Sequence, residues 1–388
     1  MRSRSRRAGA RYFWIAALLM ALVCGRAAAV TLPQPPAPHV PATAWVLIDH
    51  DSGEVLAEHI ADKPLAPASL AKLMTAYVLF GKLKAGRLQL DDQIEISRTA
   101  AAARGARLFL RPGTTVRAED LIKGMIVLSA NDAAVALAER ASGGESNFVA
   151  EMNAQARTLG LSHTVFVNVT GHDATGQVST ARDLARLASA LIRDFPEYYP
   201  WFALKEFTYN GLTQYNRNAL LWRDGAVDGV KTGQTHAAGF CHAASASHDG
   251  MRLIAVALGA KDENARVASA QRLLDYGFRN YETHLLYAAD VPATQVRVWM
   301  GDQSAVPLGV RHNLYVTLPR GWHERLHARL TVPQDKLYAP VQYGQVVGTL
   351  ALDLDGRPFA EYPLVALKQI GTGNLMRRAI DKFQLWLQ

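Results

Sequence analysis

The stretch PASLAKLMTAYVLF, residues 67–80, places Ser69 and Lys72 three positions apart at the start of an apolar run. At 3.6 residues per turn, this spacing puts both side chains on one face of a helix that begins near Ser69. Two interpretations are open. The helix is amphipathic and its lysine extends to water, or the amine is neutral in a partly apolar setting and takes a proton from the serine hydroxyl.

Two further short motifs follow in the sequence. Ser129-Ala130-Asn131 and Lys231-Thr232-Gly233 come about 60 and then about 100 residues further along the chain. A serine three positions before a lysine is expected about once by chance in a chain of this length. Separately, the motifs could be a helix cap, a loop and a strand edge, so it is their combination in this order that points to chemistry.

The first motif contains a nucleophile and its base. A serine at a helix N-terminus lies near free backbone N–H groups and the positive end of the helix dipole, which favours a developing oxyanion. A second cation close to Lys72 would lower the pKa of its amine. Lys231, on a predicted strand, is the candidate for that second cation.

The other two motifs supply groups that could hold a substrate. Ser129 can relay a proton between a nucleophile and a leaving amine, and Asn131 offers an amide to a substrate carbonyl. Lys231 and Thr232 suit a substrate carboxylate. Gly233 allows the backbone to approach an acyl group closely.

These three motifs, in this order, resemble the penicillin-recognising acyltransferases. The whole chain resembles the low-molecular-mass penicillin-binding proteins of the D-alanyl-D-alanine carboxypeptidase type. Other similar segments are TGHDATGQVSTARDLA (170–185), NRNALLW (216–222), DGVKTGQT (228–235), LGAK (258–261) and the late YGQVVGTLALDLDG and YPLVAL. The resemblance implies an α/β fold: a β-lactamase/DD-peptidase-like domain, with an antiparallel sheet, flanking helices and a helical cluster, followed by a small all-β domain and an amphipathic anchor.

The resemblance also implies roles for residues. Ser69 would be the acylated nucleophile, Lys72 its base and Ser129 a second catalytic residue. The oxyanion hole would be the backbone N–H groups of Ser69 and Gln234. Gln234 stands where histidine is common, but because its backbone acts we expect little effect on activity. Thr170 stands where some relatives carry histidine. Substrate-binding residues would be Asn131, Lys231, Thr232, Gly233, Gln234 and Arg266, with no metal and no cofactor.

The implied reaction removes the terminal D-Ala from peptidoglycan stem peptides, with β-lactam antibiotics as covalent inhibitors. Three alternatives stay open. A DD-endopeptidase would use the same residues. A β-lactamase would need an efficient deacylating base, and the Glu-x-x-Leu-Asn pattern of one major class is absent from the sequence. A silent peptidoglycan-binding scaffold would be expected to have lost Ser69 or Lys72.

The first residues predict export. A basic start, an apolar run from Tyr12 to Cys24 and small residues at 27–29 are typical of a secretory signal peptide. Its six arginines account for most of the formal net charge, which falls from +8 to about +2 without them, so we do not expect nucleic acid as a partner. Cys241 would then be the only cysteine, which we interpret as a small buried apolar residue.

Patterns along the chain predict its organisation. Two strands at 44–59 precede the Ser69 helix, and a helix-rich middle follows. Strands return in GVKTGQTHAAGFCHAASASHDGMRLIAVALGAK (229–261), in which SHDG between two alternating runs predicts a hairpin loop. Short alternating runs after residue 289 predict a β domain. We expect a signal peptide (1–29), a Pro-rich leader (30–43), a DD-peptidase domain (44–287), a β domain (288–366) and an anchor helix (367–388).

The C-terminal stretch NLMRRAIDKFQLWLQ predicts an amphipathic helix. On a helical wheel its apolar residues, except Leu385, fall within an arc of about 140°. At about 21 Å the helix is too short to span a bilayer and suits the membrane interface. The predicted location is therefore peripheral, on the periplasmic side of the bacterial inner membrane. The alternative is a terminal helix packed on its own domain.

HERLH, residues 323–327, matches a short zinc-protease pattern that requires two histidines on one helix face. The surrounding residues alternate between apolar and polar, which predicts a strand. Residues four apart on a strand are about 13 Å apart, too far to share a zinc ion simply. We therefore expect no metal site there.

Overall fold

The computed structural model describes residues 32–332 and 336–387, so the predicted signal peptide lies outside the described residues. The chain divides into two compact units. The N-terminal unit contains Gln34–Leu286 together with Leu314–Arg320, and the C-terminal unit contains Tyr287–Asn313 and the chain after Arg320. Each unit is described by itself.

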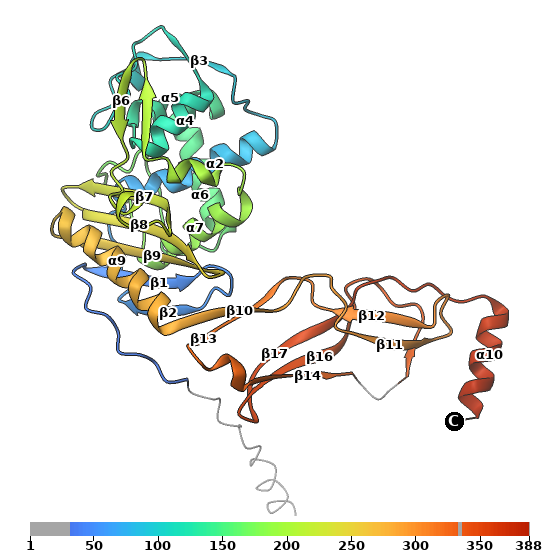
Figure 1. The fold of residues 1–388 in the computed structure, drawn as a ribbon. Helices are drawn as coiled ribbons and strands as arrows, with labels where there is room; N and C mark the ends of the chain where they lie inside the picture. Colours follow the sequence, from blue (N-terminus) through green and yellow to red (C-terminus); the bar gives the residue numbers. More distant parts are fainter. Residues whose placement is uncertain (1–31, 333–335, 388) are drawn as a thin grey trace, which may run out of the picture. The chain divides into compact units, whose positions relative to one another are not determined.

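An antiparallel five-stranded sheet forms the centre of the N-terminal unit (Figure 1). The strand order is β2-β1-β9-β8-β7, so the first two strands of the chain pair with three that follow the helical region. The predicted hairpins β1–β2 and β8–β9 are both confirmed. The bounds are β1 (Ala44–Asp49), β2 (Val55–His59), β7 (Val227–Thr235), β8 (Gly239–His248) and β9 (Met251–Ala260).

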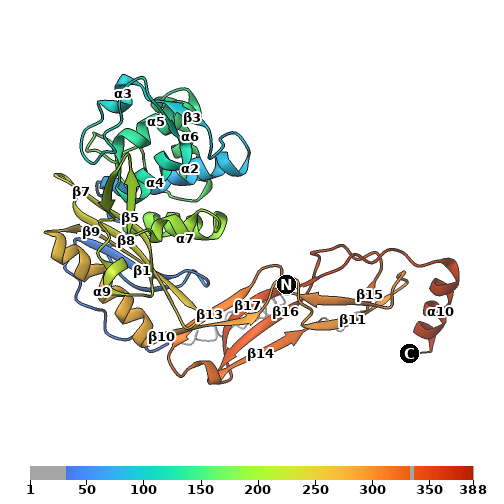
Figure 2. The same cartoon turned by 45° about the horizontal axis from the view of Figure 1, so that its top comes forward.

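Both faces of this sheet are covered, which explains why all six residues of β1 are buried. Val46 and Ile48 point into one apolar core with the helical cluster, while Trp45 and Leu47 point into a second core with α9 (Glu263–Asn280). Figures 1 and 2 show α9 and the helical cluster on opposite faces of the sheet. The unit is thus a three-layer α/β structure.

The helical cluster follows the predicted segments. The helices are η1 (Ala68–Ala71), α2 (Lys72–Lys84), α3 (Arg98–Ala101), α4 (Ala118–Val127), α5 (Asn131–Ser142), α6 (Glu145–Thr158) and α7 (Ala181–Asp194). The side chain of Thr180 caps the N-terminus of α7, since it accepts a hydrogen bond from the Asp183 N–H. Short elements complete the unit: β3 (Gln93–Glu95), β4 (Thr115–Arg117), η2 (Tyr199–Ala203), β5 (Glu206–Tyr209), β6 (Leu212–Tyr215) and α8 (Leu220–Arg223).

The C-terminal unit is built on a six-stranded sheet with the order β14-β16-β17-β12-β11-β15 (Figure 2). Its strands are β11 (Thr294–Trp299), β12 (Ala305–Gly309), β14 (Leu326–Thr331), β15 (Leu337–Tyr338), β16 (Val346–Leu354) and β17 (Arg357–Ala366). One strand within the predicted β domain lies elsewhere. β13 (Leu314–Pro319) pairs with β10 (Tyr281–Tyr287) and belongs to the N-terminal unit.

The predicted C-terminal helix is present as α10 (Leu375–Trp386), capped by Asn374, whose side chain accepts from the Arg377 N–H. Residues 367–374, expected to belong to the anchor, instead include Ile370 of the β core. Among the described residues, no helix is long and apolar enough to cross a membrane.

The HERLH segment is only partly a strand. His323–Arg325 form a short 3-10 helix, η3, and β14 begins at Leu326, so the strand prediction is wrong for the first three residues. Within residues 32–332 and 336–387, no group of three or more His, Cys, Asp or Glu side chains could hold a metal ion. Cys241 lies buried on β8 as predicted, and burial raises the pKa of its thiol to about 11.

Candidate active site

Ser69 lies in the short 3-10 helix η1, directly before α2, rather than in the α-helix itself. The preceding residue, Ala68, has φ +47, in the left-handed region that non-glycine residues seldom adopt. Such strained backbone is frequent where a nucleophile must be presented. The turn is held tightly, because Ala68, Leu70 and Ala71 are all fully buried.

Lys72 is the central group of the site. It is 2 % exposed, and its Nζ lies 3.2 Å from Ser69 Oγ, 2.6 Å from Asn131 Oδ1 and 2.6 Å from the carbonyl oxygen of Thr170. The first of the two sequence interpretations is therefore wrong, since the lysine does not extend to water.

Burial lowers the pKa of Lys72 well below its ordinary value, and the neighbouring charges of Lys231 and Arg217 lower it further. Desolvation and like charge both disfavour the ammonium form. A neutral Lys72 amine beside a serine hydroxyl can act as a general base.

The second motif forms the sharp link between α4 and α5. Ser129 adopts a left-handed backbone with φ +62, which ends α4 and lets α5 begin at Asn131. Among the residues that the structure describes, the Ser129 Oγ has no hydrogen-bond partner although it is buried. Its hydroxyl is thus available to a substrate, while the Asn131 side chain binds Lys72.

The third motif lies on β7, against the nucleophile. A Cβ on Gly233 would stand 3.0 Å from the Ser69 backbone nitrogen and 2.9 Å from Leu70 Cδ1, so only glycine allows this approach. Gly171 crowds the same nitrogen from another loop. The Ser69 backbone nitrogen therefore lies close to two glycines.

Lys231 lies beneath the pocket surface rather than on it. It is 5 % exposed, and its Nζ donates to the carbonyl oxygen of Thr232 at 3.1 Å. Burial, followed by the charges of Arg217 and Arg266, lowers the pKa of Lys231 to about 7. Lys231 acts on the site through its charge.

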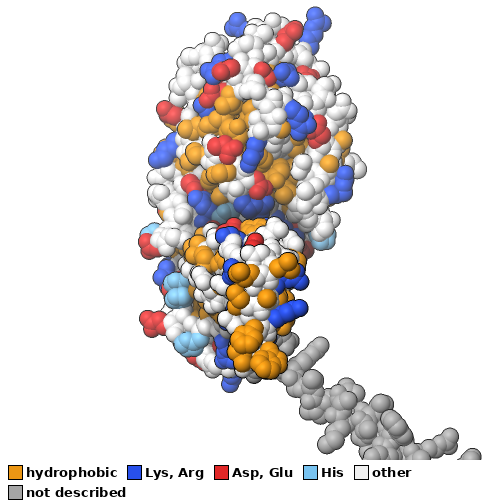
Figure 3. Space-filling view, turned by 90° about the vertical axis from the view of Figure 1, so that its right-hand side faces the viewer, with side chains coloured by type: hydrophobic (Ala, Val, Ile, Leu, Met, Phe, Trp, Pro, Cys, Tyr) orange, Lys and Arg blue, Asp and Glu red, His pale blue; other side chains and the backbone are white. Residues whose placement is uncertain are grey.

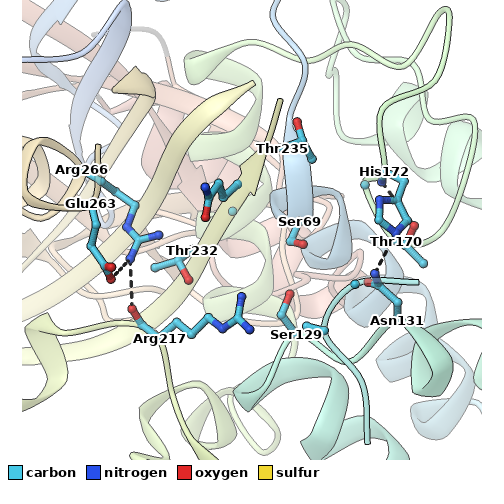
Figure 4. Close-up of a pocket in the computed structure, with 15 residues that line it drawn as sticks. Ser69, Ser129, Asn131, Thr170, His172, Arg217, Thr232, Thr235, Glu263 and Arg266 are labelled. Atoms are coloured by element: carbon cyan, nitrogen blue, oxygen red, sulfur yellow. Dashed lines mark hydrogen bonds and ion pairs between the residues drawn. The ribbon is translucent and has the colours of Figure 1, made fainter. Parts of the chain in front are cut away.

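Arginine side chains line the side of the pocket beside β7. Arg266 donates to Glu263 Oε1 at 2.7 Å and to the carbonyl oxygen of Arg217 at 3.4 Å (Figure 4). Burial lowers the pKa of Arg266. This cationic wall suits a substrate carboxylate.

These groups surround one pocket of about 410 Å³. Of the nine residues assigned from the sequence, Ser69, Ser129, Asn131, Thr232, Gly233, Gln234 and Arg266 line the pocket, and Lys72 and Lys231 lie under it. Sequence analysis gave no role to the other lining residues, which are Gly105, Ala106, Thr170, Gly171, His172, Arg217, Thr235 and Glu263. The segments containing Gly171, His172 and Arg217 had been matched to the family without assigning them functions, whereas nothing in the sequence singled out Gly105 or Ala106.

A serine, a buried lysine and a further serine at the mouth of a cationic pocket define a serine acyltransferase of the class that forms acyl-enzymes. Comparison with known proteins gives the family. Residues 29–262 match the D-alanyl-D-alanine carboxypeptidase family and residues 281–372 match the C-terminal domain of penicillin-binding protein 5. The chain belongs to this D-alanyl-D-alanine carboxypeptidase family.

Individual relatives agree with this assignment. The chain is 44% identical over 361 residues to the D-alanyl-D-alanine carboxypeptidase DacC of Escherichia coli, covering 90% of each chain. It is 42% identical to DacA of the same organism, covering 90% of this chain and 89% of that one. Penicillin-binding protein 5 from Haemophilus influenzae has a similar structure, with a TM-score of 0.81, 38% identity and coverage of 88% of this chain and 99% of that one.

Proposed function

We propose that this family member hydrolyses the terminal D-Ala-D-Ala bond of peptidoglycan stem peptides, with Ser69 as nucleophile and Lys72 as base. The observation that carries the proposal is the buried Lys72 amine, 3.2 Å from Ser69 Oγ, with a pKa lowered by burial and neighbouring cations. The comparisons support the substrate class, because the relatives are D-alanyl-D-alanine carboxypeptidases.

We propose the following steps for these residues. The Ser69 hydroxyl gives its proton to Lys72 Nζ as its oxygen bonds to the penultimate D-Ala carbonyl carbon. The Ser69 and Gln234 N–H groups stabilise the oxyanion. As the peptide bond breaks, Lys72 returns the proton to the departing D-Ala amine through the Ser129 hydroxyl. Water then hydrolyses the ester and frees Ser69.

The substrate would be oriented by its carboxylate. Thr232 and Arg266 line the pocket on the β7 side, with Lys231 beneath them. We add Arg217, which lines the same pocket and whose charge lowers the pKa values of both lysines.

β-Lactams would acylate the same serine. Penicillin-binding protein D2 from Listeria monocytogenes, 34% identical to this chain, has been solved in ampicillin-bound and cefotaxime-bound forms. A β-lactam carries a carboxylate next to its reactive amide, as the D-Ala-D-Ala terminus does. A β-lactamase would hydrolyse its acyl-enzyme rapidly, whereas a carboxypeptidase would keep the adduct for a long time. The lifetime of the adduct therefore separates the two functions.

The first experiment is intact mass spectrometry after incubation with benzylpenicillin, with antibiotic concentration followed in parallel. We expect one stable penicilloyl group on the wild-type chain, none on Ser69→Ala, and D-Ala release from a stem pentapeptide by the wild type only. Rapid penicillin consumption without an adduct would instead indicate a β-lactamase. An adduct that persists in Ser69→Ala would contradict the assigned nucleophile.

We further propose export and attachment to the periplasmic side of the inner membrane. The sequence pattern of residues 1–29 supports export. Attachment is supported by α10, whose apolar residues are exposed, and Figure 3 shows apolar side chains gathered on the surface of this end of the molecule. Asp381 of the same helix is buried. Asp381 Oδ2 accepts from the Met300 N–H at 2.6 Å, so the helix meets its own unit through a polar group.

A further inference from the structure

Asp173 lies at the mouth of the pocket, where two of the pocket walls meet. Its neighbour His172 lines the pocket from the loop between α6 and α7, and Thr235 lines it from the end of β7. Asp173 Oδ2 accepts a hydrogen bond from the Ala237 N–H at 3.1 Å, which joins this loop to the turn between β7 and β8. In the described part of the chain the Asp173 side chain makes this one hydrogen bond and no ion pair. The side chain is exposed, so its second oxygen is open to a ligand.

The edge of β7 gives the direction in which a substrate extends. β7 is the outermost strand of its sheet, and residues 232–235 of this strand line the pocket. The free edge of a strand can pair with an extended peptide. In the proposed reaction the substrate carboxylate lies at Thr232 and the scissile carbonyl at the Gln234 N–H. The peptide then runs antiparallel to β7, and its earlier residues lie toward Thr235.

The spacing of an extended chain places one particular substrate residue beside Asp173. Successive residues of a strand are about 3.3 Å apart, so the residue before D-Ala-D-Ala lies about 7 Å from the terminal one. Measured along β7 from Thr232, this is at about the level of Thr235. Asp173 faces this level from the other wall, since its carboxylate binds Ala237, two residues after Thr235.

The two ends of the pocket differ in charge. The arginines proposed to receive the substrate carboxylate lie on one side of Ser69, and His172 lies on the other (Figure 4). Glu263, the carboxylate among the arginines, is paired with Arg266 at 2.7 Å. Asp173 follows His172 in the chain, so its carboxylate belongs to the end away from the arginines. The pocket therefore suits a peptide with an anionic terminus and a cation further back.

We propose that Asp173 binds a cationic side chain on the residue that precedes D-Ala-D-Ala, so that the enzyme prefers stem peptides with a free amine there. Asp173 Oδ1 accepts from the ammonium while Oδ2 stays on the Ala237 N–H, which holds the carboxylate in place before the substrate arrives. Arg98 and Arg104 line a hollow that shares His172 with the pocket, and their charges disfavour an ammonium in that hollow. The inference rests on the proposed function.

Two peptides that differ in one charge test the proposal. Nα-acetyl-Lys-D-Ala-D-Ala carries a free side-chain amine, and Nα,Nε-diacetyl-Lys-D-Ala-D-Ala has the same backbone without this charge. We expect the wild type to release D-Ala from the free-amine peptide with about fivefold higher kcat/KM, the upper range for an exposed ion pair. The difference should appear in KM, because the ground state and the transition state make the same contact. It should shrink with added salt.

Asp173→Asn removes the charge and keeps an oxygen that can accept from the Ala237 N–H. In this variant the ratio of kcat/KM for the two peptides should fall to about one. Asp249→Asn is the matched control, because Asp249 is an exposed aspartate in the turn between β8 and β9, at the far end of β8 from the β7–β8 turn. It should keep the wild-type ratio, and the melting temperatures of both variants check the fold.

The outcomes separate this inference from the proposed function. If the wild type hydrolyses both peptides equally or prefers the diacetylated one, the inference is overturned while the carboxypeptidase function stands. A wild-type ratio in Asp173→Asn overturns it as well. If Asp173→Asn slows both peptides by the same factor, the carboxylate only joins the two loops and does not select a cation. If the wild type releases D-Ala from neither peptide, the proposed function fails, and this inference with it.

Discussion

Lys231 is a buried cation with little local compensation. It is 5 % exposed, its hydrogen bond to the carbonyl oxygen of Thr232 is the one that the structure shows, and Arg217 and Arg266 oppose its charge. Only the folded state removes such a charge from water, so its burial lowers the free energy of unfolding. In the site, its charge lowers the pKa of Lys72.

Replacing this cation should stabilise the fold while damaging the activity. We expect Lys231→Met to raise the free energy of unfolding by about 1–3 kcal/mol near pH 7 and to slow acylation sharply. The folded pKa is about 7 against an ordinary 10.5, so the unfolded chain binds more protons between these values. Wild-type stability therefore rises with pH there, and the gain from Lys231→Met should shrink from pH 7 to 10.

Chemical unfolding at pH 7 and pH 9.5 measures this difference, with the exposed Lys63→Met as the matched control. Comparing each variant with the wild type at the same pH removes the contribution of other titrating groups. If Lys231→Met were less stable than the wild type at pH 7, Lys231 would stabilise the fold rather than destabilise it.

At the level of elements, the Asp132 carboxylate helps to hold the loop that contains Gly105 and Ala106 to α5, together with the hydrogen bonds from Asn131 to the carbonyl oxygens of Ala106 and Arg104. Asp132 is fully buried, and it accepts from the N–H groups of Leu108 at 3.0 Å, Leu110 at 3.2 Å and Ala133 at 2.9 Å. The loop before Leu108 contains Gly105 and Ala106, which line the pocket. Asp132 therefore connects the helix that presents Asn131 to the opposing wall.

Asp132→Asn should weaken this connection, because an amide N–H2 would replace one acceptor and face a backbone donor. We expect the free energy of unfolding to fall by about 2 kcal/mol and penicillin acylation to slow. Urea unfolding and acylation rates measure the two effects. Glu95 is an exposed carboxylate on β3. Glu95→Gln should change the free energy of unfolding by no more than about 0.5 kcal/mol and should leave the acylation rate unchanged. Unchanged acylation in Asp132→Asn would argue that the loop is held by other contacts.

The helices and strands themselves were largely predictable from the sequence, because the hydrophobic periodicity and the capping and turn residues that specify them act locally. The position of β13 was not, because the alternation in Leu314–Pro319 predicts a strand but cannot name its partner, which is β10. The site shows the same limit. The side chains of Ser69 and Lys72 carry a sequence signature, whereas the Thr170 carbonyl that binds Lys72 is backbone, and any residue could supply it.

At the scale of the whole molecule, all the residues that line the pocket belong to the N-terminal unit. α10 belongs to the C-terminal unit and exposes 60 % of Phe383 and 80 % of Trp386. The helix contacts its own unit, as in the alternative given by the sequence, but it does so through polar groups such as Asp381, and its apolar face is exposed. An exposed apolar face of this kind is typical of helices that lie in a membrane interface.

If α10 binds membrane, adding two charges to its apolar face should release the protein without affecting catalysis. Phe383→Glu with Trp386→Glu removes about 1.5–3 kcal/mol of apolar transfer energy per side chain, so phospholipid vesicles should bind at least roughly tenfold more weakly. Val291→Glu with Val346→Glu adds the same charge to exposed apolar residues of the same unit outside α10, and should leave binding unchanged. Deletion of residues 374–388 should abolish binding, and all of these variants should acylate with penicillin at the wild-type rate. Continued sedimentation of the deletion variant with vesicles would place the membrane contact elsewhere in the chain.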